Sequence, residues 1–328
     1  MKSRELSRFA LSVCAATAML AGCGGSQPPI DAPSLSQNSS QGSGLVKPSS
    51  VTPTYQTSGP LLYVTSSGEP SYVSLYDATA KNPKPIAAIT KDVNLPEGDC
   101  VDGDGTLYVV NSSSSGGWLS EYALGQTRPL RVITKGINTP SYCATDASGN
   151  LWVTNIGLFD VVEYLKGSAK PHATITKGLT YPDGIAIDHA GNLYVGNLQP
   201  YSTSNIQVYA PGSKSPSRTI TDGITWPVGI AVDAHDTLYV TNYTAPGNVE
   251  EYRVGQSKPF RTITDKLVNP ADVVVSKNGW LYVANWGYTS GEQAILEFPP
   301  HSLKASSRAI TKAVFNPIGL GYYPPLLP

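Results

Sequence analysis

The chain repeats a unit of about 45 residues over most of its length, which restricts it to folds built from stacked copies. One copy reads PDGIAIDHAGNLYVGN from Pro182, continues through NIQVYAPGSKSPSRTIT and ends at Thr221. An Ile-Thr pair closes each copy, and two further landmarks keep the same period. They are the prolines Pro96, Pro140, Pro182, Pro227, Pro270 and Pro317, and the asparagines Asn111, Asn155, Asn197, Asn242 and Asn285. Three landmarks with one period indicate that every copy folds as the same small unit.

Each copy contains four short runs rich in Val, Ile, Tyr and Thr, which predict the four strands of an antiparallel sheet. The turn between the first two strands reads DGDGTL, DASGNL, DHAGNL or DAHDTL, and its Asp and Gly are typical of a tight hairpin. One such sheet is marginal alone because both of its faces need covering. Packing the sheets radially around a channel covers them, and this arrangement is a β-propeller.

The two ends of the repeat region fix the number of blades. The first copy begins at Leu61, in a segment that matches a second strand, and the last copy ends with Pro317–Gly321, which matches a first strand. The last segment therefore completes the first blade. We predict an all-β, six-bladed β-propeller of four-stranded antiparallel blades over residues 60–328, in which the C-terminal strand closes the ring.

The repeats resemble the NHL type, whose motif P-x-G-x-A-x-D-x-x-G-x-L-Y-V-x-N is matched best from Pro182 to Asn197. The resemblance covers residues 60–328 and implies a six-bladed propeller. It implies less about activity, because related propellers include binding modules, lyases and lactonases.

The first residues resemble a bacterial lipoprotein signal, with basic residues at Lys2, Arg4 and Arg8 and a short apolar run. The segment Leu20-Ala21-Gly22-Cys23 resembles a lipobox, so residues 1–22 are expected to be removed and Cys23 to be lipidated. An ordinary signal peptide with a chance cysteine is the alternative. We expect an exported protein that is lipid-anchored to the cell envelope, and in a Gram-negative host Gly24 favours the outer membrane.

The domain that follows, residues 23–59, contains the lipidated cysteine and a tether rich in Ser, Gln, Pro and Gly. Its low apolar content predicts a disordered spacer. No apolar run reaches the roughly 20 residues that a transmembrane helix needs, so the only predicted membrane contact is the lipid anchor.

Two kinds of connection lie at the same end of the predicted propeller: the loops between the second and third strands of each blade, and the joints that lead from one copy to the next. We call this end the loop face. The loops are long and variable, as binding loops on a rigid scaffold are. The candidate ligand-binding residues are aromatic or acidic: Tyr243, Trp286, Tyr288, Phe159, Tyr201, Asp183 and Asp272. The expected partner is a protein, a peptide or a glycan. Tyr181, Trp226 and Phe315 are expected to pack as wedges between blades.

Acidic residues near the joints offer an alternative function. Glu97, Asp99, Asp183 and Asp272 could join some of the repeated asparagines in binding Ca²⁺ or another divalent cation. The resemblance then implies a metal-assisted, lactonase-like hydrolase or lyase. Against this, an asparagine in five copies suits a scaffold role, in which it ends its strand and bonds its own loop. No other cofactor is expected.

The four histidines argue against much of the catalytic repertoire. His189 and His235 lie in turns after the first strands, and His172 and His301 lie near connections to the fourth strands, all away from the loop face. A catalytic triad or a histidine-bound zinc ion there is therefore unsupported. The net charge of -1 also lacks the basic excess of a nucleic-acid-binding protein. Together these features favour a membrane-anchored binding or scaffold propeller over an enzyme.

Two cysteines remain once Cys14 is removed with the signal and Cys23 is lipidated. Cys100 and Cys143 lie on the first strands of neighbouring blades with opposite parity, so their side chains face each other or point apart. An exported protein permits a disulfide. A pair of buried free thiols is the alternative.

Overall fold

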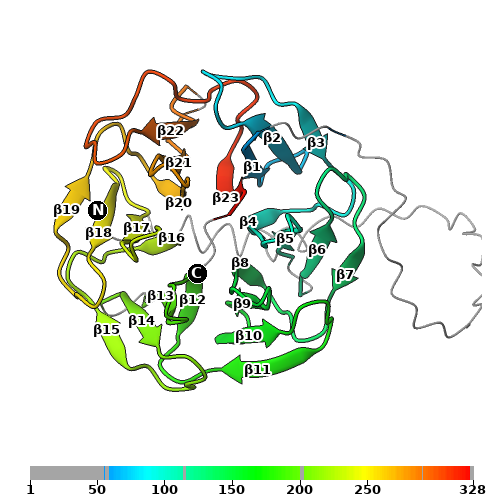
Figure 1. Cartoon of the computed structure of the whole chain (residues 1–328), viewed down its shortest axis with the longest axis vertical. Helices are drawn as coiled ribbons and strands as arrows, with labels where there is room; N and C mark the ends of the chain where they lie inside the picture. The colour runs from blue at the N-terminus through cyan, green and yellow to red at the C-terminus, as the bar shows by residue number, and fades with distance from the viewer. Residues whose placement is uncertain (1–54, 56–58, 114–115, 200–202, 290, 326–328) are drawn as a thin grey trace, which may run out of the picture. The chain divides into compact units, whose positions relative to one another are not determined.

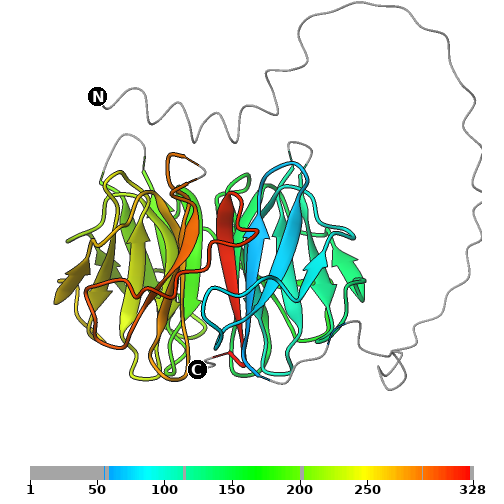
Figure 2. The ribbon, with the colours of Figure 1, turned by 90° about the horizontal axis from the view of Figure 1, so that it is seen from above.

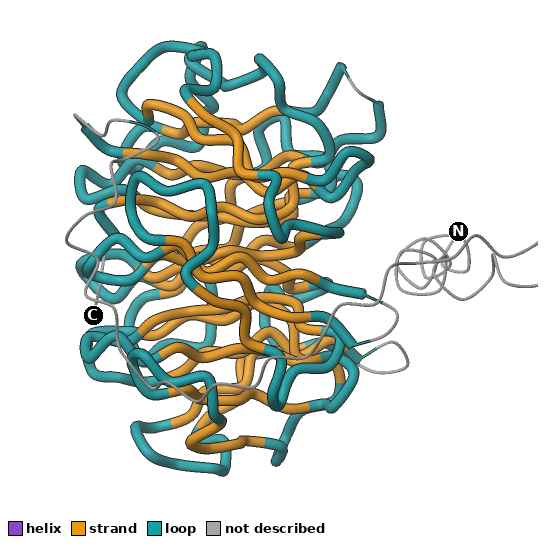
Figure 3. Tube along the Cα trace, turned by 90° about the vertical axis from the view of Figure 1, so that its right-hand side faces the viewer, coloured by secondary structure: helices purple, strands orange, loops and turns teal. Residues whose placement is uncertain are grey.

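Six antiparallel sheets surround a central axis in the computed structural model, which describes residue 55 and residues 59–113, 116–199, 203–289 and 291–325 (Figure 1). The described strands run between two opposite faces, with loops or turns at each end (Figures 2 and 3). The signal peptide, Cys23, nearly all of the tether and Tyr201 lie outside the described residues. No helix among the described residues has the length and apolar character needed to cross a membrane.

From the channel outward, blade 1 contains β23 (Pro317–Tyr323), β1 (Leu61–Ser66), β2 (Tyr72–Asp77) and β3 (Ala87–Ile89), and the strands of the other blades follow in the same order. Blade 2 contains β4 (Pro96–Val101), β5 (Leu107–Asn111), β6 (Trp118–Tyr122) and β7 (Arg131–Ile133). Blade 3 contains β8 (Pro140–Thr145), β9 (Leu151–Asn155), β10 (Asp160–Tyr164) and β11 (Pro171–Ile175).

Blade 4 contains β12 (Tyr181–Ile187), β13 (Leu193–Leu198), β14 (Asn205–Tyr209) and β15 (Arg218–Ile220). Blade 5 contains β16 (Pro227–Val232), β17 (Leu238–Asn242), β18 (Asn248–Tyr252) and β19 (Arg261–Ile263). Blade 6 contains β20 (Pro270–Val275), β21 (Leu281–Asn285) and β22 (Ala294–Phe298).

The structure confirms the predicted six-bladed, all-β fold and its closure. β23 pairs antiparallel with β1, so the last strand completes the first blade. Blade 6 differs in one detail, because its outermost strand is reduced to a single bridge between Ile295 and Ile310 in the described part of the chain.

The interior lies between the blades, where each sheet packs against its neighbours. Between blades 1 and 2, for example, Tyr63 and Leu75 pack with Leu107, Val109 and Tyr122. Both faces of each sheet are covered, so the second and third strands are near-continuous runs of buried residues. Each buried Val, Leu or Ile side chain contributes about 1.5–3 kcal/mol, which makes this interior the main source of stability.

The aspartates after the innermost strands close the predicted hairpins. Asp102 Oδ1 accepts hydrogen bonds from the backbone N–H groups of Asp104 at 3.0 Å and Thr106 at 2.8 Å. Asp146, Asp188 and Asp233 make the equivalent pair of bonds. Gly105 adopts a φ of 83°, as expected for a tight turn. These turns form the end of the propeller opposite the loop face, which we call the turn face.

The repeated asparagines are part of the scaffold, but their Oδ1 atoms bond the preceding joints, whereas the sequence led us to expect each asparagine to bond its own loop. Each is buried, and its Oδ1 accepts a hydrogen bond from the joint that precedes its own blade. The donors are the backbone N–H groups of Asn94, Asn138, Thr180, Thr225 and Val268, at 2.6–3.1 Å. These bonds fix each joint of the loop face to the blade that follows it in the chain.

Candidate functional site

The loop face carries the predicted aromatic residues on two neighbouring blades. Tyr243 follows β17 in blade 5, Trp286 follows β21 in blade 6, and their rings lie 6.3 Å apart between centroids. Tyr288, two residues further on, is 54% exposed. We call these three residues the aromatic patch. Phe159 is 46% exposed but lies on blade 3, where it packs edge-on against Tyr181 at 5.3 Å.

Hydrogen bonds fix the backbone that carries the patch. The N–H groups of Tyr288 and Thr289 donate to Glu292 Oε2 at 2.8 and 3.1 Å. The N–H of Trp286 donates to the carbonyl of Asn269, in the preceding joint, at 3.2 Å. An exposed side chain on a fixed backbone loses little conformational entropy when it binds.

Phe315, expected from the sequence to pack as a wedge between blades, is 42% exposed on the joint between blades 6 and 1. Its ring lies against Gly68, where an added Cβ would be 2.4 Å from Phe315 Cε1. The residue therefore packs on one side and leaves the other open on the loop face.

The four predicted acidic residues lie on innermost strands within the channel. Glu97 and Asp99 come from β4, Asp183 from β12 and Asp272 from β20. Asp183 is 1% exposed, and Asp99 and Asp272 are each 4% exposed. Glu97 keeps partial exposure of its surface, although protein atoms surround its carboxyl group. Asp183 and Asp272 were predicted as ligand-binding residues of the loop face, and the structure places them inside the channel instead.

The hydrogen bonds of these acids are incomplete. Ser141 Oγ donates to Asp183 Oδ1, while the backbone N–H groups of Val273 and Leu320 each donate to one oxygen of Asp272 at 2.8 Å. Both oxygens of Asp99 and Oδ2 of Asp183 are buried without a partner among the described residues. No ion pair in the described part of the chain involves any of the four acids.

Burial and mutual repulsion keep protons on these carboxyl groups. Burial, with the nearby carboxyl of Asp183, raises the pKa of Glu97 to about 8. Burial raises the pKa of Asp183 to about 7, against the opposing hydrogen bond from Ser141. Burial also raises the pKa of Asp99 and Asp272 well above the ordinary range, with Asp272 adding to the shift of Asp99. The carboxyl groups of Glu97 and Asp183 interact electrostatically although blade 3 separates their blades.

The acids do not form one metal-binding group. Within the described residues, no three Asp, Glu, His or Cys side chains lie close enough together to hold a metal ion. The asparagines that were considered as further ligands bond the joints instead. The metal-assisted alternative therefore has no ligand set in the part of the chain that the structure describes.

Tyr142 closes the channel between these acids. Its ring is buried, and its hydroxyl lies within hydrogen-bonding distance of two carbonyl oxygens across the axis, Ala271 at 3.2 Å and Ile318 at 3.1 Å. Four other blades have glycine at the equivalent position: Gly98, Gly184, Gly229 and Gly319. An added Cβ at Gly98 would be 2.5 Å from the Tyr142 ring, so the missing side chain of Gly98 makes room for it. An added Cβ at each of the other three glycines would meet a neighbouring innermost strand instead.

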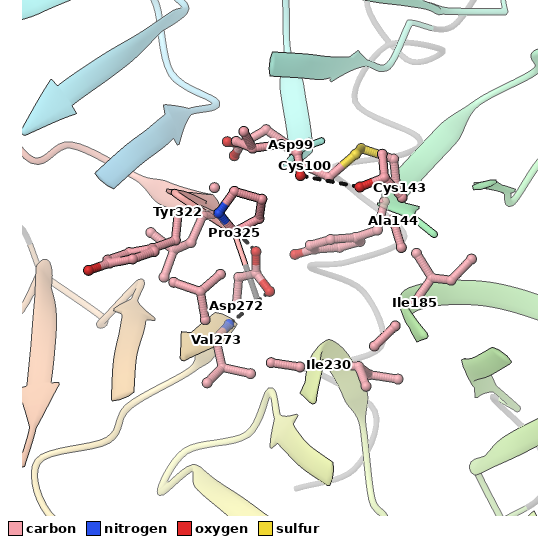
Figure 4. Close-up of a pocket in the computed structure, with 18 of the residues that line it drawn as sticks. Asp99, Cys100, Cys143, Ala144, Ile185, Ile230, Asp272, Val273, Tyr322 and Pro325 are labelled. Atoms are coloured by element: carbon pink, nitrogen blue, oxygen red, sulfur yellow. Dashed lines mark hydrogen bonds between the residues drawn. A yellow bond between two sulfur atoms is a disulfide. The ribbon is translucent and has the colours of Figure 1, made fainter. Parts of the chain in front are cut away.

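A cavity of about 140 Å³ lies between Tyr142 and the ends of the innermost strands at the turn face. Figure 4 shows this cavity with Asp99, Asp272 and the disulfide beside it. Tyr142, Asp99 and Asp272 line it together with the later residues of all six innermost strands. Glu97, Ser141 and Asp183, near the starts of their strands, are not part of the lining. The apolar wall residues are mainly branched aliphatic side chains: Val101, Ile185, Ile187, Ile230, Val232, Val273, Val274, Val275 and Leu320. The aromatic residues predicted from the sequence to bind a ligand lie on the opposite face where the structure describes them, and none of these aliphatic wall residues was among the predicted ones.

A disulfide between Cys100 and Cys143 joins β4 to β8 beside the cavity, with a Cα–Cα distance of 5.7 Å. Of the two arrangements that the sequence left open, the structure therefore has the cysteines facing each other. The bond fixes two neighbouring innermost strands to each other.

The histidines lie away from both candidate sites, as the sequence indicated. His189 Nδ1 lies 2.7 Å from Asp236 Oδ1, between two hairpins of the turn face. His172 is on β11, at the outer edge of blade 3. Neither residue lines the cavity. This placement leaves no histidine beside a nucleophile at either candidate site, within the described residues.

Comparisons with solved structures identify other propellers of similar shape. A structure of a nidogen/laminin complex matches with a TM-score of 0.64 at 18% identity, covering 80% of this chain and 98% of the matched chain. A Bacteroides caccae protein of unknown function matches with a TM-score of 0.61 at 15% identity, covering 81% and 99%. A putative 6-phosphogluconolactonase from Bacteroides fragilis matches with a TM-score of 0.58 at 16% identity, covering 81% and 98%.

No protein-family model matches the chain, and no curated protein matches it. At identities below 20%, the likeness to these structures shows the six-bladed propeller fold. The resemblance to NHL repeats remains a prediction from the sequence.

Proposed function

We propose that this protein is an extracytoplasmic binding module whose loop face docks a protein or an extended peptide through the aromatic patch. Lipidation of Cys23 would hold the module on the cell envelope, and residues 24–59 would separate it from the membrane surface. A glycan is the other class of ligand that aromatic rings on a polar face can bind, and the experiment below separates the two.

The observation that carries this proposal is the exposed Tyr288 beside the packed pair of Tyr243 and Trp286. Tyrosine and tryptophan are enriched among the residues that contribute most to protein interfaces. They bury a large area with only two rotatable side-chain bonds each. Because their loops are fixed to the preceding joints, little ordering cost opposes binding.

The surroundings of the patch indicate the chemistry of its partner. The loops that carry it read NYTAPGN and NWGYTSGEQ, and they contain hydroxyl and amide groups with a single charged residue, Glu292. That carboxylate is already engaged by two backbone N–H groups. We therefore expect apolar contacts and neutral hydrogen bonds to dominate, so binding should weaken little with added salt.

The test compares three forms of the purified protein: wild type, the double variant Trp286→Ala/Tyr288→Ala, and the control Val254→Ala. Val254 is 58% exposed near the turn after β18, away from the patch. Each form is immobilised and exposed to envelope proteins and to a glycan array. A protein held by wild type and control but lost by the double variant supports the proposal. Equal capture by all three forms, or binding only on the glycan array, contradicts it.

A further inference from the structure

The cavity on the turn-face side of Tyr142 has features of a ligand site that the proposed loop-face function does not use. Its volume of about 140 Å³ is close to that of cavities that bind benzene-sized molecules. Its walls are aliphatic, while Asp99, Asp272 and Tyr142 supply polar groups. Asp272 comes from β20 and Asp99 from β4, two strands that belong to different blades (Figure 4).

The charged side chains of the described cavity lining are all acidic. Its described residues include two carboxyl groups and no lysine, arginine or histidine. Each oxygen of Asp272 accepts one backbone hydrogen bond and keeps a second acceptor position. Asp99, which is 4% exposed, has no hydrogen-bond partner among the described residues for either oxygen. A buried carboxyl group without a partner is costly, and a donor or a cation at this site would offset that cost.

We propose that this cavity binds a small organic cation, a primary ammonium group on a short apolar body. The ammonium group donates to Asp272, with Asp99 as the second neighbouring carboxyl. The apolar body packs against the aliphatic walls that extend from Asp272 along the innermost strands. An anion would meet two carboxyl groups, and a metal ion would leave the aliphatic walls uncovered, so neither matches the lining as well.

Binding of a cation should also change the number of protons that the cavity acids hold. Burial raises the pKa of Asp99 and Asp272, so the empty cavity holds protons that an ammonium ion would displace. The titratable groups that interact with this pair are Tyr63, Tyr142 and Asp183, none of which supplies a positive charge. Cation binding should therefore release a proton, and binding of a neutral isostere should not.

The test uses three probes of one shape: benzylammonium, benzyl alcohol and benzoate. Calorimetric titration of the purified protein should give an affinity for benzylammonium at least about tenfold above that for benzyl alcohol, because a charge-assisted hydrogen bond is stronger than a neutral one. Benzoate should not bind. Repeating the benzylammonium titration in buffers of different ionisation enthalpy should reveal proton release.

Three variants locate the site. Ala144→Phe fills the cavity from a partly exposed wall position and should abolish binding of both benzylammonium and benzyl alcohol. Asp272→Asn should reduce benzylammonium binding to the level of benzyl alcohol. Asp99→Asn, which removes a carboxyl without breaking a hydrogen bond among the described residues, should weaken benzylammonium several-fold while the fold persists.

Three results would each overturn the proposal: equal affinity for benzylammonium and benzyl alcohol, no binding of benzylammonium, or unchanged binding in Ala144→Phe. The double variant of the aromatic patch should bind benzylammonium as wild type does. Failure of the loop-face proposal and failure of the cavity proposal are therefore separate outcomes.

Discussion

The buried acids of the channel should make the protein less stable as the pH rises from 5 to 7.5. Glu97 has a pKa raised to about 8 from an ordinary 4.5, mainly by burial. Between these values the folded state keeps a proton that the unfolded chain has released. The unfolding free energy then falls by about 1.4 kcal/mol per pH unit, or about 3 kcal/mol over this range, from Glu97 alone. Asp99, Asp183 and Asp272 act in the same direction, since their pKa values are raised as well.

Urea unfolding at pH 5 and at pH 7.5 measures this effect. Glu97→Gln removes the titration, so the loss of stability between the two pH values should be smaller than in wild type by about 3 kcal/mol. Glu69→Gln, at an exposed loop position, is the matched control and should keep the wild-type dependence. Asp77 and Asp236 have lowered pKa values and act below about pH 4, outside the measured range. If Glu97→Gln retains the wild-type loss of stability, Glu97 is ionised in the folded protein and the reasoning from burial fails.

Four further outcomes follow from the scaffold. Tyr164→Phe removes the hydroxyl that donates to the carbonyl of Lys135 at 2.7 Å and should cost about 1 kcal/mol in urea unfolding. The side chain of Asn155 bonds the preceding joint through both of its polar atoms, so Asn155→Ala should cost about 3 kcal/mol in the same assay. A loss of stability no larger than that of Tyr164→Phe would contradict the scaffold role of Asn155. Replacing Cys100 and Cys143 with serine opens a loop with a sequence separation of 43 and should cost up to about 4 kcal/mol, seen also as a lower melting temperature on reduction of the wild type. EDTA and excess Ca²⁺ should leave the melting temperature unchanged, whereas a rise of about 5 °C or more with Ca²⁺ would restore the metal-assisted alternative.

The fold was predictable because each landmark of the repeat has a local structural task. The side chains of Asp102 and its equivalents close hairpins by accepting hydrogen bonds from backbone N–H groups of their own turns, and Asn155 and its equivalents fix the joints. Such bonds recur in each copy and leave a periodic signal in the sequence. The weak outer strand of blade 6 leaves no such signal, since Ile310 is followed by the same threonine as in the other copies.

The channel was harder to predict, because its residues were taken as parts of the joints between copies. Their positions along the innermost strands are what place them in the channel. Tyr142 occupies the position at which Gly98, Gly184, Gly229 and Gly319 stand in other blades. That contrast was present in the sequence, and it indicates a position where the innermost strands approach one another closely and one blade carries a large side chain. The cavity has no comparable signal, because Ile185, Ile187 and their equivalents read equally well as core residues.

Tyr142 divides the channel into two environments that remain electrostatically connected. Glu97 and Asp183 are absent from the cavity lining, Asp99 and Asp272 are part of it, and burial together with the charges of all four acids raises the pKa of Tyr142. Asp183 also interacts with Asp272, so a negative charge on one side of Tyr142 opposes ionisation on the other side. The raised pKa values of Asp99 and Asp272 keep the empty cavity protonated, and an ammonium ion that displaces one proton leaves the net charge of the cavity unchanged. Binding of the proposed ligand should therefore leave the ionisation of Glu97 and Asp183 unaltered, whereas a proton lost from the empty cavity would oppose it.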